Sequence, residues 1–171
     1  MKKGQVWVET MIYTLIFLTL IGVLLAYAQP KINELKEKTT IEQSITLLED
    51  IDNIILSIVQ GGPGNRRLID INLKQGEFII DGEEDKIVFE MDTTYDFSEP
   101  GKEVDIGRIK AITTDKGKIN KVKLIKDYNQ YNITYNGKDV KESITSSPNP
   151  YKMYISNKGS NGQTNIDIQV E

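Results

Sequence analysis

One carboxylate in an apolar setting is the most informative chemical feature of this sequence. Glu9 stands just before a run from Met11 to Ala28 that contains no charged residue. A carboxylate at the edge of a membrane's hydrocarbon costs on the order of 2–3 kcal/mol unless it finds a partner. If the chain were cut after Gly4, the new α-amino group of Gln5 would be a cation with which Glu9 of a neighbouring copy could pair. Such a cut would give the Glu9 carboxylate the partner that it otherwise lacks.

Residues that usually carry catalysis or bind metals are scarce in this chain. It contains no cysteine and no histidine, which excludes disulfides, thiolate ligands, Ser-His-Asp triads and ordinary zinc sites. The acidic stretch Asp81–Asp85 lacks the alternation and closing glutamate of an EF-hand loop, and we interpret it as a solvated turn. No two carboxylates can be placed across a cleft from the sequence alone. We expect no enzymatic activity, no metal site and no cofactor.

A possible modification site lies in the second half of the chain. Asn132, Ile133 and Thr134 form an N-glycosylation sequon. In a strand that turns Tyr131, Ile133 and Tyr135 towards a core, Asn132 would point outwards. The pattern is consistent with modification of Asn132, although such triplets also arise by chance.

Charge predicts how the chain is oriented and which partners it lacks. The formal net charge at pH 7 is −4, and it becomes more negative if Lys2 and Lys3 are removed with a leader. An acidic balance argues against binding to nucleic-acid phosphates. Lys2 and Lys3 are also the only charges before Glu9, so the positive-inside tendency places the N-terminus in the cytoplasm and the remainder outside.

A long helix must position Glu9. At ~1.5 Å per helical residue, the uncharged run can cross most of a bilayer core. Pro30 ends this run and predicts a kink or a short melted stretch, after which the helix resumes. Apolar residues then recur at spacings of three and four up to Gln60, which predicts one buried face: Ile41, Ile45, Leu48, Ile51, Ile55 and Ile58.

The N-terminal residues resemble the class III signal of type IV pilins, particularly archaeal ones. The resemblance rests on Lys2-Lys3-Gly4, then Gln5, then Glu9 at the fifth position after the cut, followed by an apolar helix. Trp7 and Tyr13 stand where many archaeal members carry Ser and Leu. The resemblance covers the segment up to Pro30 and does not extend to the remainder of the chain.

The resemblance implies a structural subunit of an extracellular type IV pilus-like filament. A prepilin peptidase would cut between Gly4 and Gln5, and Glu9 would aid assembly. The partners would be identical or related pilin subunits, whose apolar helices form the filament core after a stage in the cell membrane. Such a filament serves cell adhesion, motility or secretion.

Three other interpretations of the same segment remain open. In a plain signal anchor, Glu9 would mark only the membrane boundary. In a secretory signal peptide, cleavage would follow the A-x-A pattern of Ala26-Tyr27-Ala28, directly before Gln29. The chain could also be a single-pass, membrane-tethered extracellular binding module that forms no filament.

Beyond the helix, the sequence predicts short strands separated by turns. Gly61-Gly62-Pro63-Gly64 stops the helix, and we interpret it as a turn because no Gly-Lys-Ser/Thr follows, as a phosphate-binding loop would require. Three segments predict a meander: residues 68–73, 78–81 and 87–91. Gly107 predicts a bulge, and Asn136-Gly137 predicts a hairpin. The final segment of alternating residues, 166–170, predicts a strand with one polar face.

The predicted fold is therefore α+β, a long N-terminal helix carrying an antiparallel β domain. Either one sheet packs on the helix stripe or a small sandwich sits at the helix end. The predicted divisions are a leader at 1–4, an apolar transmembrane or filament-core helix at 5–29, an amphipathic helix at 30–60, a Gly/Pro linker at 61–67 and an extracellular β domain at 68–171.

Overall fold

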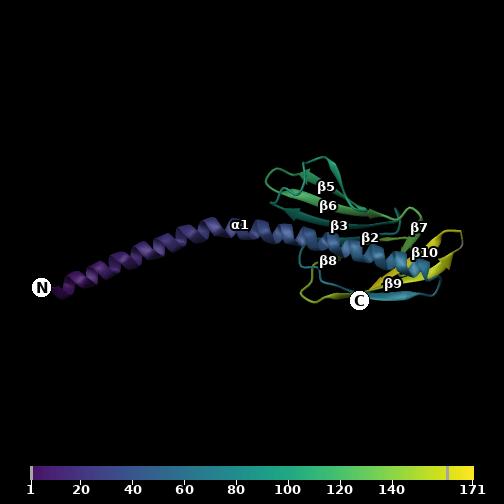
Figure 1. Ribbon diagram of the computed structural model, residues 1–171, viewed down its shortest axis with the longest axis horizontal. Helices are drawn as coiled ribbons and strands as arrows, with labels where there is room; N and C mark the ends of the chain where they lie inside the picture. The colour runs from purple at the N-terminus through teal and green to yellow at the C-terminus, as the bar shows by residue number, and fades with distance from the viewer. Residues whose placement is uncertain (1, 161) are drawn as a thin grey trace. The chain divides into compact units, whose positions relative to one another are not determined.

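The computed structural model describes residues 2–160 and 162–171, with side chains from residue 6 onwards except at 160. One helix, α1 (Lys2–Gln60), precedes all the strands (Figure 1). The strands are β1 (Arg66–Ile71), β2 (Glu77–Asp81), β3 (Lys86–Thr93), β4 (Glu103–Ile106), β5 (Ile109–Asp115), β6 (Asn120–Asp127), β7 (Tyr131–Tyr135), β8 (Lys141–Thr145), β9 (Tyr151–Ser160) and β10 (Thr164–Val170). The α+β class predicted from the sequence is confirmed.

The chain divides into two compact units. The first comprises the N-terminal residues up to Lys36, and the second spans Glu37–Glu171. Helical structure continues through Pro30 without interruption, so the short melted stretch considered as one outcome there is absent. Pro30 lacks only a single backbone donor, and the remaining hydrogen bonds of a long helix are enough to keep this segment helical.

The second unit contains two sheets. The four-stranded sheet has the order β1-β9-β10-β7, and the six-stranded sheet has the order β4-β5-β6-β3-β2-β8. Strand pairs in the described residues are antiparallel except β7 with β10, which is parallel. The helix therefore packs against two sheets rather than against a single antiparallel one.

The helix stripe lies at the centre of one core shared by both sheets. The predicted positions Ile41, Leu48, Ile51, Ile55 and Ile58 are each at most 1% exposed, and Ile45 is partly buried. They join Phe78 and Phe89 of one sheet and Ile155 and Ile166 of the other, among other residues. Burying each such side chain contributes about 1.5–3 kcal/mol, so this stripe is a main source of the unit's stability.

Two predicted strand pairings are wrong. β1 pairs with β9 and not with β2, so the three-strand meander is reduced to the β2–β3 hairpin. Asn136 and Gly137 do form a tight turn, with φ of 51° and 73°, but β8 leaves it to pair with β2 in the other sheet. Alternation of residues specifies the two faces of a strand but not its neighbour, so these partners were not available from the pattern.

Gly107 also has a different role from the predicted bulge. Ile106 pairs with Ile109, so Gly107 and Arg108 form the two-residue turn between β4 and β5. Its φ of 59° suits such a turn, since hairpin turns of this length need positive φ. The turn places Arg108 close to α1.

Candidate functional site

The apolar half of α1 is the most unusual surface of the protein. Its large apolar side chains are exposed throughout: Val6, Trp7, Val8, Met11, Ile12, Tyr13, Leu15, Ile16, Phe17, Leu18, Leu20, Ile21, Val23, Leu24, Leu25, Tyr27, Ile32 and Leu35. The helix contains a segment long and apolar enough to cross a membrane, and none of that segment is buried. Soluble proteins rarely expose apolar patches of this extent, and such a patch suggests contact with a membrane or with other apolar surfaces.

Glu9 lies on this surface and has a partner within its own helix. The hydroxyl of Tyr13 donates to Oε1 of Glu9 over 3.3 Å, one helical turn further along. This bond is at the long end of the normal range, and it leaves the second carboxylate oxygen available. A neutral hydroxyl lowers the cost of placing Glu9 in an apolar medium but does not neutralise its charge. The carboxylate can therefore still pair with a cation.

Threonine hydroxyls in the same segment are satisfied by the helix itself. Thr10, Thr14 and Thr19 donate to the carbonyl oxygens four residues earlier, at 2.8–2.9 Å. In an apolar environment no water is available for these groups, so the internal bonds remove the need for outside partners. The segment is thus compatible with hydrocarbon or with a close-packed bundle of helices.

The other residues singled out from the sequence lie elsewhere. Gly4 and Gln5 belong to α1 by their backbone, but their side chains lie outside the described residues. Asn132 is half-buried on β7, and its Nδ2 donates to Asp139 over 3.3 Å. The hydroxyl of Thr134 in the same sequon is buried and lies 3.1 Å from Oδ1 of both Asp167 and Asn165, either of which can accept its proton. The leader cut and the modification of Asn132 stay predictions.

A buried charge cluster that was not predicted from the sequence joins α1 to the six-stranded sheet. The Asp52 side chain is only 5% exposed, and its Oδ2 lies 2.8 Å from Nη1 of Arg108. Its Oδ1 lies 3.4 Å from Nζ of Lys126, which itself lies 5.4 Å from the centroid of the Tyr128 ring. Burial, aided by the Asp52 charge, raises the pKa of the Tyr128 hydroxyl, so this phenol stays neutral.

A signal for this cluster was present in the sequence. Asp52 follows Leu48 by four residues and precedes Ile55 by three, so it stands on the apolar stripe. A charged residue on a buried face needs a cation nearby, because burying an unpaired charge is very unfavourable. The pattern did not identify which cations, since Arg108 and Lys126 come from distant strands.

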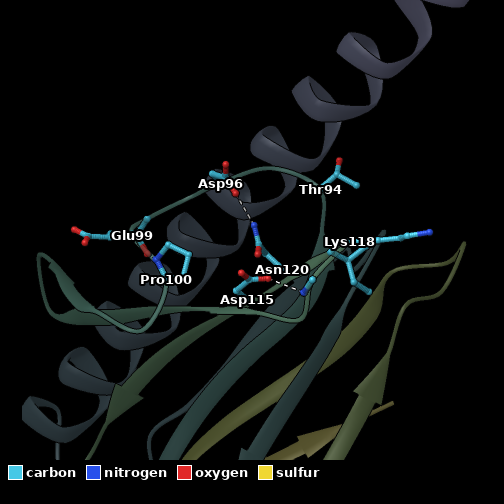
Figure 2. A pocket seen from close by; sticks show the side chains of 10 residues that line it. Thr94, Asp96, Glu99, Pro100, Asp115, Lys118 and Asn120 are labelled. Carbon is cyan, nitrogen blue, oxygen red and sulfur yellow. Dashed lines mark hydrogen bonds between the residues drawn. The ribbon is translucent and has the colours of Figure 1, made fainter.

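A hollow of about 620 Å³ lies among the loops at one end of the six-stranded sheet (Figure 2). The two carboxylates in it that face the sheet already have partners. Asp96 accepts from Nδ2 of Asn120 at 2.6 Å, and Asp115 accepts from the backbone N–H of Gly117 at 2.6 Å. Glu99 points away from the hollow and binds Lys102. No group of three or more acidic residues that could hold a metal occurs in the described part of the chain.

Comparisons with known proteins found no relative of this chain. The sequence matches no known protein family, and neither curated proteins nor solved structures give a match. The architecture itself, a long apolar N-terminal helix followed by β-sheets, is consistent with a type IV pilin-like fold.

Proposed function

We propose that this protein is a structural subunit of an extracellular type IV pilus-like filament. A prepilin peptidase would remove the leader after Gly4, and the apolar segment of α1 would then leave the membrane and pack with the same segment of other copies. The observation that carries the proposal is the exposed apolar surface from Val6 to Leu35, near the start of which the carboxylate of Glu9 stands directly before an uncharged run. An anchor needs the apolar surface but has no use for Glu9.

The pairing of charges explains how Glu9 would act. The α-amino group of Gln5 in an incoming copy would neutralise the Glu9 carboxylate of a copy already in place. In an apolar core, such an ion pair is much stronger than in water, and an unpaired carboxylate is strongly disfavoured. Glu9 would therefore favour the one axial register that supplies it with a cation, while Tyr13 limits the cost before assembly.

Replacing Glu9 by Ala tests this role. We expect E9A to be cut after Gly4 like the wild type but to fail to assemble, because the register-specific pair is lost. E34A is the matched control, since Glu34 is another exposed carboxylate of the same helix, paired to Lys31 at 2.7 Å, and should leave assembly intact. Filaments would be counted by negative-stain electron microscopy, and processing would be followed by gel mobility.

The N-terminal residue of the mature protein separates the alternatives. Gln5 supports the filament subunit, Met1 a plain anchor and Gln29 a secreted form. Normal filaments from E9A, or a wild type that never forms filaments, would contradict the proposal. The second of these results would favour a membrane-tethered binding module, in which the unit at Glu37–Glu171 recognises a ligand.

A further inference from the structure

The outer strands of the two sheets are not equally protected. Apart from the apolar half of α1, four large apolar side chains are exposed in the described residues: Leu68 at 51%, Val104 at 40%, Ile119 at 40% and Val140 at 36%. Leu68 lies on β1 and Val104 on β4, which are outer strands of different sheets. The other two outer strands, β7 and β8, carry no such side chain. Exposed apolar outer strands favour pairing with another chain.

The free backbone groups on these strands follow from their pairing. Asn157 donates its N–H to the carbonyl of Asn65, so the antiparallel alternation turns the backbone groups of Arg66, Leu68 and Asp70 away from β9. The two-residue turn after Ile106 places Glu103 and Asp105 in the same outward position on β4. By contrast, the outer side of β7 is capped, because Ile133 donates its N–H to Asp85 at 2.7 Å.

Charge and shape of the two strands are complementary. β1 begins with Arg66 and Arg67, whereas β4 carries Glu103 and Asp105, and all four residues are exposed. A hollow borders β1 where it faces α1, and two of its lining residues are the apolar Ile54 and Ile69. An incoming strand could place Val104 on this apolar lining and its acidic residues beside the arginines. An antiparallel pair of two β1 strands would set Arg66 against Asp70 but would join only two copies, whereas pairing of β1 with β4 can continue from copy to copy.

The two strands also lie at opposite sides of the second unit. β5, the inner neighbour of β4, and β9, the inner neighbour of β1, lie on opposite sides of the strands' part of Figure 1. One copy could therefore use β1 for one neighbour and β4 for another. Contacts between two different surfaces propagate into rings or helical filaments, whereas a contact of a surface with itself stops at a dimer.

We propose that β1 of one copy pairs with β4 of the next, so that neighbouring β domains are joined by strand addition. The occupant of each open strand is thus a second copy of this chain, and this inference rests on the proposed filament function. The contact is short, since β4 is a strand of 4 residues, and it would set the lateral register of subunits already held by their helices. An antiparallel register with Arg66 opposite Asp105 pairs the opposite charges.

Engineered cysteines test the pairing cleanly, because the natural chain has no cysteine. In the antiparallel register with Arg66 opposite Asp105, Leu68 lies opposite Glu103 on the same face, so we expect oxidised filaments of the double variant Leu68→Cys with Glu103→Cys to give a ladder of linked species on a non-reducing gel. Each single variant should remain mostly monomeric. The matched control is Leu68→Cys with Val140→Cys, whose second position is also exposed but does not lie on β4, and it should give no ladder.

A charge exchange provides the second test. R66E should lower the yield of the ladder several-fold, and adding D105R should restore it. Arg66 also stacks on the Tyr154 ring of its own chain at 4.1 Å. If R66E acted only through the loss of this stacking, D105R on β4 would not restore the yield of the ladder. Intact filaments without a ladder, or a ladder unaffected by R66E, would overturn the strand pairing but leave the filament function standing. A wild type without filaments would overturn both.

Discussion

Removal of the Asp52 carboxylate should weaken the attachment of α1 to the six-stranded sheet. In the variant Asp52→Ala, Lys126 would lose its anion although its side chain is only 13% exposed. Breaking a buried pair by deleting one partner costs about 3 kcal/mol or more, because the remaining charge is buried without compensation. Arg108 is half-exposed and can be rehydrated, so the loss of its ion pair with Asp52 should add less than about 1 kcal/mol. We expect the free energy of unfolding to fall by about 3–4 kcal/mol.

Urea unfolding of the full chain in a non-ionic detergent would measure this change, with near-ultraviolet circular dichroism as the signal. Asp50→Ala is the matched control, because Asp50 lies on the same helix but is exposed, and it should change stability by less than about 0.5 kcal/mol. The double variant Asp52→Ala with Lys126→Met should recover part of the loss, since no charge is then left buried. Equal losses for Asp52→Ala and Asp50→Ala would refute the reasoning.

Two further predictions concern a hydrogen-bonded carboxylate and a glycine. Burial raises the pKa of the Glu37 carboxyl, but hydrogen bonds from Thr93 and Thr94 outweigh it and hold this pKa below its usual range. The contribution is therefore present above the unfolded pKa of about 4.3 and lost as pH falls through the folded value, so Glu37→Gln should cost about 1–2 kcal/mol in urea unfolding at pH 7 and progressively less in acid. Glu42→Gln, on an exposed side chain of the same helix, is the control and should change the stability at pH 7 by less than about 0.5 kcal/mol. Gly76 has φ of 83°, and a Cβ there would lie 2.6 Å from the Glu90 carbonyl oxygen and 2.7 Å from the Phe89 ring. Gly101 has a similar φ of 79°, but a Cβ there would meet nothing within 4 Å. Gly76→Ala should therefore lower the melting temperature more than Gly101→Ala. Equal shifts for the two glycine variants would contradict the crowding argument.

Features that depend on near neighbours in the chain could be predicted from the sequence. The stripe of Ile41, Leu48, Ile51, Ile55 and Ile58 follows from helical periodicity, and it is the stripe found in the core. The Asn136-Gly137 turn follows from the positive φ that these residue types tolerate. Glu9 stood out because a carboxylate before an apolar run is unfavourable in any fold. In each case, the physical cause acts within a few residues.

Features that depend on distant segments were decided only by the tertiary structure. The pairing of β1 with β9, and the parallel pairing of β7 with β10, bring together segments whose own patterns would suit several neighbours. Asp167 illustrates the reason: its Oδ1 accepts from Thr134 and from the N–H of Gly137, which ties the turn to β10. The same holds for the cations around Asp52 and for the open strands β1 and β4. The sequence alone determined which residues must be buried or paired. Their partners were determined by the common core of the two sheets, because the need for burial specifies only one face of an element, whereas packing selects the element that covers this face.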